Sequence, residues 1–587
     1  MPQYQAPLDD YQFLMKDWLA IDAHYQSLNK DEFDMEIASE VIAQGAKFAI
    51  DVLAPLNREG DEQGCRLENG EVKTPDGFAA AYKNYVANGW NSMLGSADFG
   101  GQDLPYTMAV PVHEMLNATN LGWRLTPLLT ESAVLALTKH ASEELKEAYL
   151  PQLISGEWTG TMNLTEPHAG TDLSLLRTKA VPQGDGSYKI TGNKIFITGG
   201  EQDWTSNIIH LVLARLPDAP AGVKGISLFV VPKFLLDDNG APGQRNSLSV
   251  GSIEHKMGVK ASPTCVMNFD EAKGFLVGQE NQGLACMFTM MNDARFQVGL
   301  QGIGTADASY RGALSYAQER LQSRAPQGPQ QPENKADAII FQPDVARMLL
   351  TQRSMVEGCR ALAMLYAKFM DVEKFGDQDR QAEADQILQF LTPICKAFMT
   401  DMGLEATNIG VQVFGGHGYI REWGMEQLVR DTRIALLYEG TNGVQAQDLI
   451  GRKLTRNGGH YLKATYKAFE DIASAIENEQ NKGSALALLN DWLALSESCL
   501  DLNAFDAAAV SCDYLAYTGY SLLGVLWYSM SDTASRSENQ AFAVSKRKTC
   551  EFYISKILPR RDAFKASLLS GSDVLMAVNE SSTDYIW

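Results

Sequence analysis

The sequence predicts an α+β protein in which helical and β-rich segments follow one another as blocks. Three observations support this: helical apolar spacing over residues 8–160, strand-like alternation over 161–282, and helical spacing again from 283 onward. Separate blocks are typical of α+β folds, whereas strands alternating with helices would indicate a doubly wound sheet. No G-x-G-x-x-G motif stands between a strand and a helix, so a Rossmann dinucleotide site is not expected.

The chain of 587 residues is too long for one hydrophobic core. We expect four domains: an N-terminal helical domain at 1–160, a middle β-barrel-like domain at 161–282, a helical bundle at 283–455, and an additional C-terminal helical domain at 460–587. The glycine-rich segment Arg456–Gly459 is the expected linker before the last domain.

Composition excludes several classes of function. The net charge is −22 and lysine and arginine do not cluster, which argues against nucleic acid and anionic membrane surfaces as partners. No run of about 18 apolar residues predicts an integral membrane segment, and Met1–Pro7 lacks the features of a signal peptide. The eight cysteines are scattered, so neither a metal site nor a disulfide framework is expected. Free thiols in a reducing, cytoplasmic setting fit this pattern.

The first two blocks differ in the period of their apolar residues. Tyr11–Leu19 and Met35–Ile42 have helical spacing, and Gly70, Pro75 and Gly77 interrupt the block before the next helix. In the second block, Tyr188–Gly200 alternates like a strand, with a turn expected at Gly192–Asn193. Two further β-rich runs follow at 208–216 and 225–233.

Long helices are expected in the third block at Leu284–Gln318, Asp344–Met370 and Gln386–Val413. Between the first two, Ser323–Asp337 is rich in glutamine and proline and is expected to form an exposed loop. A further helical block covers Tyr461 to about Leu569. For the tail, Glu580–Trp587, a frayed and a docked conformation both remain open.

One segment, Leu436–Gly443, has the composition of a catalytic turn. Its carboxylate, Glu439, directly follows the apolar run Ile434–Tyr438. Burial raises the pKa of a carboxylate, and a general base that works near neutral pH needs such a rise. Gly440 and Gly443 allow the backbone to approach a flat ligand closely. The alternative is a glutamate at a helix N-terminus, stabilised there by the helix dipole.

Four segments stand in a fixed order: Met162–Asp172, Lys194–Gly200, Gln412–Tyr419 and Tyr438–Thr441. Together they resemble the acyl-CoA dehydrogenase family of flavoenzymes. The resemblance covers about residues 35–455. The extra C-terminal block resembles the long bacterial branch of the family, which includes 3-methylmercaptopropionyl-CoA dehydrogenases and long fatty acyl-CoA dehydrogenases.

This resemblance implies an enzyme that holds FAD without a Rossmann fold and converts an acyl-CoA thioester to the trans-2-enoyl-CoA. By the same match, Glu439 is the base that takes the α proton, while the β hydride goes to N5 of FAD. A proton beside a thioester is weakly acidic until the carbonyl is polarised, so a desolvated base and fixed donors must act together. The implied electron acceptor is an electron-transferring flavoprotein.

The resemblance also assigns ligand-binding residues. Phe196 stands where the family usually has tryptophan, and Ser323 and Arg324 replace a Phe-Gly pair after Arg320, so the match departs from the family at these positions. The implied FAD-binding residues are Met162, Leu164, Thr165, Thr171, Phe196, Thr198, Arg320, Gln322, Gln412, Gly415, Gly416, Thr441 and Gly443. The implied substrate-binding residues are Thr171, Asn292, Arg295, Tyr438 and Gly440.

Three alternatives remain open at this point. An acyl-CoA oxidase would use the same base but admit oxygen, a 3-methylmercaptopropionyl-CoA dehydrogenase would differ in substrate, and a non-catalytic scaffold would have lost the chemistry. Straight medium or long fatty acyl-CoAs are the first expected substrates, with methylthiopropionyl-CoA next. The extra block is expected to cover the face on which dimers of shorter relatives pair into tetramers, so we expect a homodimer.

Overall fold

The computed structural model describes residues 4–576, so the tail Glu580–Trp587 lies outside the described residues. The chain forms two compact units, each made of segments that are separate in the sequence. As far as the structure describes them, the first unit combines Met1–Ala46, Tyr106–Ala118 and Val298–Trp587, and the second combines Lys47–Pro105 and Thr119–Gln297. Among residues 4–576, no helix is long and apolar enough to cross a membrane.

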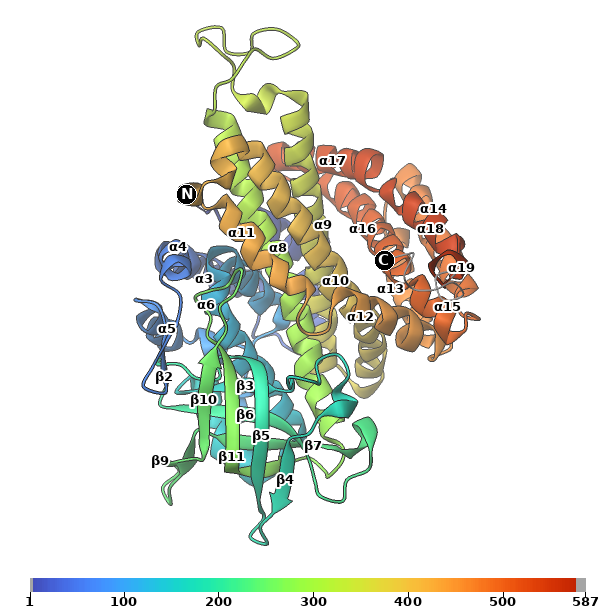
Figure 1. Cartoon of the computed structure of the whole chain (residues 1–587). Coiled ribbons are helices and arrows are strands. Elements are labelled where there is room, and N and C mark those ends of the chain that lie inside the picture. Colours follow the sequence, from blue (N-terminus) through green and yellow to red (C-terminus); the bar gives the residue numbers. More distant parts are fainter. Residues whose placement is uncertain (1–3, 577–587) are drawn as a thin grey trace. The chain divides into compact units, whose positions relative to one another are not determined.

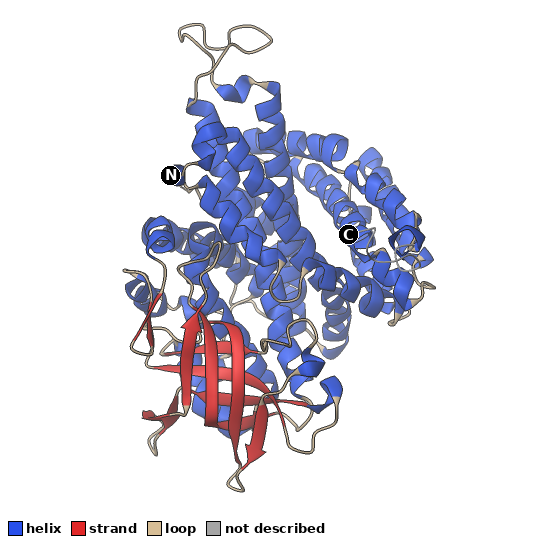
Figure 2. Cartoon of the chain, viewed as in Figure 1, coloured by secondary structure: helices blue, strands red, loops and turns tan. Residues whose placement is uncertain are grey.

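The second unit contains the sheet and the helices around it (Figures 1 and 2). Its strands are β1 (Arg66–Glu68), β2 (Glu71–Lys73), β3 (Trp158–Asn163), β4 (Lys179–Pro182), β5 (Ser187–Thr198), β6 (Asn207–Arg215), β7 (Ile226–Pro232), β8 (Phe234–Leu236), β9 (Pro242–Arg245), β10 (Leu248–Ile253) and β11 (Thr264–Val277). Its helical elements are η2 (Ala49–Leu53), α4 (Ala54–Gln63), α5 (Phe78–Ala87), η3 (Trp90–Ser92), η4 (Ala97–Phe99), α7 (Glu143–Ser155), η5 (Leu173–Leu175) and η6 (Gly222–Gly225), with parts of α6 and α8.

The main sheet curls into a barrel, as predicted for the middle domain. Its strands lie in the order β10-β11-β5-β4-β6-β3, and β7 pairs with both β11 and β6, which closes a ring of five strands. Strands β6 and β7 are apolar and buried along almost their whole length, as strands are when both faces are covered. The barrel interior is filled by side chains such as Val212, Phe229 and Phe269.

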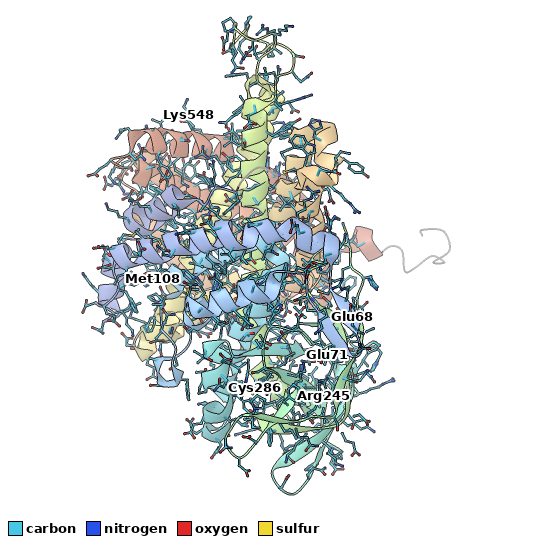
Figure 3. The ribbon with its side chains drawn as sticks, turned by 90° about the vertical axis from the view of Figure 1, so that its left-hand side faces the viewer. Glu68, Glu71, Met108, Arg245, Cys286 and Lys548 are labelled. Carbon is cyan, nitrogen blue, oxygen red and sulfur yellow. The ribbon has the colours of Figure 1, made fainter. Side chains whose placement is uncertain are left out.

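Two features of this unit differ from the sequence prediction. The first is the hairpin β1–β2, which was not expected inside the N-terminal helical block; it buries Val72 and exposes Glu68 and Glu71 (Figure 3). The second is Gly192, where the predicted turn is wrong, because β5 runs through it without a break. A Cβ on Gly192 would lie 2.4 Å from the Thr178 hydroxyl, so the glycine allows two backbones to approach closely.

The long helix α6 (Tyr106–His140) contains one residue with non-helical backbone, Asn120 (φ −158°, ψ 81°). Its side-chain oxygen accepts a hydrogen bond from the backbone N–H of Trp123 at 3.0 Å. Asn120 therefore caps the second half of the helix, which begins where the chain passes from one unit to the other.

The first unit is helical. Its elements are α1 (Leu8–Gln12), η1 (Phe13–Trp18), α2 (Ile21–Ser27), most of α3 (Met35–Phe48), the start of α6, the rest of α8 (Gly283–Glu319), η7 (Ile339–Phe341), α9 (Pro343–Phe375), α10 (Gln378–Phe414), η8 (Gly415–Tyr419), η9 (Arg421–Trp423), α11 (Met425–Arg433), η10 (Ile434–Leu436), α12 (Asn442–Gln447), η11 (Asp448–Thr455), α13 (His460–Ser474), α14 (Glu479–Ser498), α15 (Ala504–Ala509), α16 (Ser511–Ala534), α17 (Gln540–Phe552), η12 (Tyr553–Ile557), α18 (Arg560–Leu569) and α19 (Asp573–Met576). The three long helices predicted for the bundle are thus confirmed as α8, α9 and α10.

The C-terminal block packs tightly against the bundle within the first unit. Helix α16 is its buried centre, surrounded by α13, α14, α17 and α18 (Figure 1). A Cβ on Gly519 of α16 would lie 2.3 Å from the Phe398 ring of α10, and a Cβ on Gly358 of α9 would lie 2.8 Å from Trp527. Glycine at these positions lets the helices approach closely, so α9, α10 and α16 share one core. The four predicted domain ranges themselves stay a prediction.

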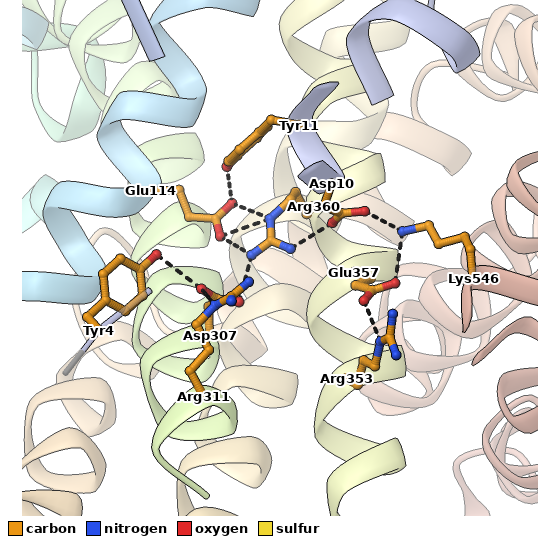
Figure 4. Close-up of polar contacts among 10 residues, drawn as sticks. All are labelled: Tyr4, Asp10, Tyr11, Glu114, Asp307, Arg311, Arg353, Glu357, Arg360 and Lys546. Atoms are coloured by element: carbon orange, nitrogen blue, oxygen red, sulfur yellow. Dashed lines mark hydrogen bonds and ion pairs between the residues drawn. The ribbon is translucent and has the colours of Figure 1, made fainter. Parts of the chain in front are cut away.

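A buried ionic cluster joins the N-terminal segment, the bundle and the C-terminal block (Figure 4). At its centre, the Arg360 guanidinium of α9 lies 2.8 Å from Asp10, 2.5 Å from Glu114 and 2.9 Å from Asp307. Lys546 of α17 donates to Asp10 at 2.5 Å and to Glu357 at 2.8 Å. Four acidic and four basic side chains balance in charge, which is what a buried cluster requires. Its members are Tyr4, Asp10, Tyr11, Glu114, Asp307, Arg311, Arg353, Glu357, Arg360 and Lys546.

Candidate active site

Glu439 lies in a tight turn between η10 and α12, and its side chain is half-buried. Its φ is +57° and that of Gly440 is +81°, so two successive residues have left-handed backbone. For a residue other than glycine this conformation costs about 1–2 kcal/mol. Strain of this kind persists only where surrounding contacts hold it, and it is concentrated at functional positions.

Tyr438, directly before Glu439, anchors the turn to α8. Its hydroxyl donates a hydrogen bond to Oε1 of Gln301, which is fully buried. Burial raises the pKa of the Tyr438 phenol, and the nearby Glu439 carboxylate raises it further. The phenol therefore stays protonated at neutral pH and acts as a donor to Gln301, so the substrate contact predicted for Tyr438 would use its ring or backbone.

Gln445 holds the same turn from α12. Its Nε2 donates to the backbone oxygen of Glu439 at 3.0 Å. A Cβ on Gly440 would lie 2.7 Å from that nitrogen, so Gly440 is needed both for its φ and for this contact. Gln445 was not among the predicted site residues, because a buried glutamine looks in sequence like an exposed one.

In the middle domain, several residues predicted to bind FAD lie where β3 ends, alongside β5. The backbone oxygen of Thr165 accepts a hydrogen bond from the N–H of Ile195 at 2.9 Å. The backbone oxygen of Leu164 accepts one from the Lys194 ammonium at 3.0 Å. These contacts hold the segment after Met162 against the strand that carries Phe196 and Thr198, whereas Thr171 is exposed further along the loop.

A buried ion pair between Glu166 and Lys194 stabilises the contact between the segment after β3 and strand β5. The Glu166 carboxylate is 3% exposed and accepts from Lys194 at 2.9 Å and from the Thr178 hydroxyl at 2.6 Å. Burial alone would raise the pKa of Glu166, but Lys194 and Thr178 lower it by more. Burial outweighs the pull of Glu166 on Lys194, so the pKa of Lys194 falls to about 8. No spacing rule could have paired residues 28 positions apart.

Phe196 is held out of the barrel by a bulge. Between the pairs Cys265–Ile197 and Met267–Lys194, β5 has one residue more than β11. Within this bulge, Phe196 has a φ of +61°, and the residue is 59% exposed. Bulges of this kind redirect side chains near active sites. A large aromatic ring in a strained backbone and facing outward is consistent with the predicted role as a wall for a flat cofactor.

In the first unit, the other predicted FAD residues lie at exposed helix ends. Gln412 is in the last turn of α10, and Gly415 follows the helix with a φ of +59°. No described atom lies within 4 Å of a Cβ placed on Gly415 or Gly416, so their backbone is open. Arg320 follows the end of α8, and its exposed guanidinium has no ion-pair or hydrogen-bond partner among residues 4–576.

Gln322, two residues further, pairs through its backbone N–H with the oxygen of Asp337 at 3.0 Å. Asp337 is fully buried and anchors the predicted Gln/Pro loop by accepting from three backbone N–H groups and from Arg324. The loop is therefore an ordered excursion closed beside Arg320. At α12, the Thr441 hydroxyl accepts from the N–H of Val444 at 3.2 Å and caps the helix.

The two substrate residues predicted on α8 contact each other in the second unit. The Arg295 guanidinium donates to Oδ1 of Asn292 at 3.1 Å and lies 5.7 Å from the centre of the Phe288 ring. Between them is Asp293, which was not predicted and accepts from the Ser132 hydroxyl at 2.6 Å. Burial raises the pKa of Asp293 to about 6.

Taken separately, the predicted residues of the two units have the chemistry that binds a flat ring system and a phosphate group. The exposed Phe196 ring offers a stacking wall, the open backbone of Gly415 and Gly416 allows close approach, and the Arg320 guanidinium can pair with a phosphate. The chemistry of these residues is therefore compatible with FAD. The structure brings the predicted residues into two groups, one in each unit.

Comparison with known proteins covers almost the whole chain. Four family models match in succession: the N-terminal domain of acyl-CoA dehydrogenase at residues 37–157, its middle domain at 161–272, its C-terminal domain at 281–454, and the acetyl-CoA dehydrogenase C-terminal-like domain at 463–579. The last match covers the extra helical block.

Three curated relatives are similar over most of their length. The chain is 46% identical to a 3-methylmercaptopropionyl-CoA dehydrogenase of Ruegeria pomeroyi, over 82% of this chain and 81% of the relative. It is 37% identical to a butyryl-CoA dehydrogenase of Syntrophomonas wolfei, over 95% of each. It is 30% identical to the broad-specificity linear acyl-CoA dehydrogenase FadE5 of Mycobacterium tuberculosis, over 99% of this chain and 100% of the relative.

Two solved structures show the same fold. An acyl-CoA dehydrogenase complexed with FAD from Bacillus anthracis superposes with a TM-score of 0.72 at 19% identity, covering 92% of this chain and 89% of that one. A chain from work on the electron transferring flavoprotein of Acidaminococcus fermentans has a TM-score of 0.58 at 26% identity, covering 71% of this chain and 97% of that one.

Proposed function

The chain belongs to the acyl-CoA dehydrogenase family, and on this premise we propose that Glu439 is the base that removes the α proton of its substrate. The protein is an FAD-dependent acyl-CoA dehydrogenase. In this reaction the Cα–H bond breaks and leaves its electrons on the acyl group, and the proton goes to the Glu439 carboxylate. FAD, when bound, supplies the acceptor for the hydride that leaves Cβ.

The observation that carries this proposal is the strained turn of Glu439. A half-buried carboxylate in left-handed backbone, fixed through Tyr438 and Gln445, is a preorganised acceptor for a proton. The alternative of a simple helix-cap glutamate is not favoured, because Thr441 and not Glu439 caps α12. The same geometry argues against a non-catalytic scaffold, which would gain nothing from holding this strain.

Replacing Glu439 with glutamine tests the assignment. The variant should retain FAD, and an acyl-CoA substrate should no longer bleach the flavin absorbance under anaerobic conditions. The matched control is Glu383→Gln, an exposed glutamate on α10, which should be reduced at the wild-type rate. Undiminished bleaching in Glu439→Gln would refute the assignment of the base.

For the ligands, we propose that the predicted residues contact FAD, and that Arg320, Gln322, Gln412, Gly415 and Gly416 receive the FAD of a second subunit. Arg320 supports this, because its exposed guanidinium is available for a phosphate group. Arg320→Ala should lower FAD affinity without changing the unfolding temperature of the apoprotein.

For the substrate, we propose an unbranched acyl-CoA. The curated relatives include enzymes named for butyryl-, broad linear and 3-methylmercaptopropionyl substrates. A thioether sulfur replaces one methylene of a straight chain with little change of shape, so a pocket for a linear chain of about five atoms would accept the methylthio compound too. A panel of straight acyl-CoAs and 3-methylthiopropionyl-CoA, assayed with an artificial electron acceptor, would rank them.

We further propose an electron-transferring flavoprotein as electron acceptor, a cytoplasmic location and a homodimer. The solved chain from Acidaminococcus fermentans supports the first, and eight scattered cysteines, all free thiols, support the second. The dimer is supported by the packing of α16 on α9 and α10, which occupies one face of the bundle. Rapid peroxide formation would favour an oxidase, and a tetrameric mass in light scattering would contradict the dimer.

A further inference from the structure

The turn that carries Glu439 is held by a third contact, made by the side chain of Asn442. Asn442 is the first residue of α12, three positions after Glu439. Its Oδ1 accepts a hydrogen bond from the Lys396 ammonium at 2.8 Å, and its Nδ2 donates to the Asp401 carboxylate at 2.8 Å. Lys396 and Asp401 both lie on α10, so this one amide ties the start of α12 to a long helix of the bundle.

Two further hydrogen bonds complete the contact. The same Nδ2 lies 3.0 Å from the hydroxyl oxygen of Thr400 and 3.2 Å from the backbone oxygen of Ala397. Every polar atom of the amide therefore faces α10. The charges fix its orientation: the carbonyl oxygen meets a buried cation and the amino group meets an anion, so a flipped amide would oppose both.

These contacts are not needed to end or cap α12. Its N-terminal N–H groups are served by the Thr441 hydroxyl, which accepts from Val444. The bridge is not a feature of the solvent-exposed surface either, because Lys396 is fully buried. A buried ammonium is costly unless it is paired. The remaining effect of the Lys396–Asn442–Asp401 bridge is to hold the backbone that leads into Gly440 and Glu439.

We propose that Asn442, held by Lys396 and Asp401, is a positioning residue that fixes the Glu439 turn in its left-handed conformation for proton removal. The inference rests on the proposed role of Glu439 as the base. Tyr438 fixes one end of the turn through Gln301 and Gln445 fixes its middle, so Asn442 supplies the anchor at the other end. A turn anchored at one end only would place the carboxylate less accurately, and small displacements of a reacting group cost up to about 100-fold in rate.

The test is anaerobic stopped-flow reduction of the FAD-loaded enzyme by the acyl-CoA that the wild type uses best. Asn442→Leu has a similar volume and no polar atoms, and its flavin reduction should slow about 10- to 100-fold. The KM for the acyl-CoA and the FAD content should stay within about threefold of wild type. With substrate deuterated at C2, the isotope effect on reduction should increase, because proton removal limits the rate more strongly. A purely structural role would change FAD content or melting temperature and leave the isotope effect unchanged.

The matched control is Asn408→Leu, an exposed asparagine on the same helix α10. Among the described residues, its amide bonds only to the backbone oxygen of Leu404. It should keep the wild-type rate. A second pair protects against misfolding of the first variant: Asp401→Asn keeps an oxygen that can accept from Asn442 and should retain most of the rate, while Asp401→Leu removes it and should be slowed.

Flavin reduction at the wild-type rate in FAD-loaded Asn442→Leu would overturn the positioning role. Equal rates of flavin reduction in Asp401→Asn and Asp401→Leu would overturn it too. Slowed reduction with an unchanged isotope effect would overturn it as well. The Glu439→Gln variant distinguishes failure of the positioning role of Asn442 from failure of the proposed function. If that variant is inactive while Asn442→Leu is normal, only the positioning role fails, whereas full reduction of Glu439→Gln removes the base itself.

Discussion

Replacing Lys546 with methionine probes the buried cluster that joins the C-terminal block to the rest of the first unit. The Lys546 ammonium is fully buried and donates to Asp10 and Glu357. Methionine has a similar shape and no charge, so two buried carboxylates lose a cation. Removing one partner of a buried ion pair typically costs about 3–5 kcal/mol. Asp10 keeps Arg360 and Glu357 keeps Arg353, so we expect the lower end, about 3 kcal/mol.

This loss should be visible as a shift in thermal unfolding of the FAD-loaded protein, followed by circular dichroism at pH 7. With an unfolding entropy of about 2.1 cal/mol/K per residue and about 350 residues in the unit, 3 kcal/mol lowers the melting temperature by about 4 °C. The matched control is Lys548→Met, two residues along the same helix and exposed (Figure 3), which should change it by less than about 1 °C.

The pH dependence gives a second test of the same variant. Burial raises the pKa of Asp10, but Lys546 and Arg360 lower it by more, to about 2. Because this lies below the value of about 3.9 for an unfolded aspartate, the pairing stabilises the fold above pH 4 and is lost as the pH falls toward 2. The difference between wild type and Lys546→Met should therefore persist from pH 7 to about pH 4 and shrink as the pH falls from 4 toward 2. A difference that grows on acidification, or an equal loss in Lys548→Met, would refute the reasoning.

Phe196→Gly should stabilise the apoprotein by about 1 kcal/mol, because it relieves left-handed strain, and it should weaken FAD binding. Urea unfolding measures the first effect and titration with FAD the second. A destabilised apoprotein would contradict the strain at Phe196. Gly519→Ala should cost about 1–3 kcal/mol by overpacking against the Phe398 ring, whereas Gly483→Ala, with nothing within 4 Å, should gain up to about 1 kcal/mol; thermal shifts of the same sign would count against this packing. Burial raises the pKa of Asp293 to about 6, so the wild type loses stability as the pH rises from 4 through 6. Asp293→Asn should therefore stabilise the protein more at pH 7 than at pH 4 in urea unfolding, and equal gains at both values would argue against that pKa.

Much of the fold could be predicted because its signals are local. Apolar periodicity identified α8 nearly to its ends, but it ended α9 too early, at Met370, and began α10 too late, at Gln386. The run of strands identified the barrel. Glycines were harder to interpret. Gly192 predicted a turn, yet it lies inside β5 and serves the close approach of Thr178. A glycine needed for packing and one needed for a turn look the same in sequence, since only the neighbouring backbone distinguishes them.

In the candidate site, too, only the residues with a local sequence signal could be predicted. Glu439 and its glycine neighbours were identified from an apolar run and a short motif, both confined to a few residues. The groups that hold the turn in place were not: Gln301, Lys396 and Asp401 come from helices α8 and α10, far away in the sequence. Their types are ordinary for helical residues, and only their burial beside the turn gives them a role.

The sequence by itself determined the order of helical and β-rich blocks, the family resemblance and the identity of the proposed base, because periodicity and short motifs are properties of neighbouring residues. Only the tertiary structure decided how the strained turn at residue 439 is held and how the C-terminal block is joined to the N-terminal segment. Lys546 and Asp10 are 536 residues apart. Such a pair forms because burial makes an unpaired charge costly, and burial is known only once the chain has folded.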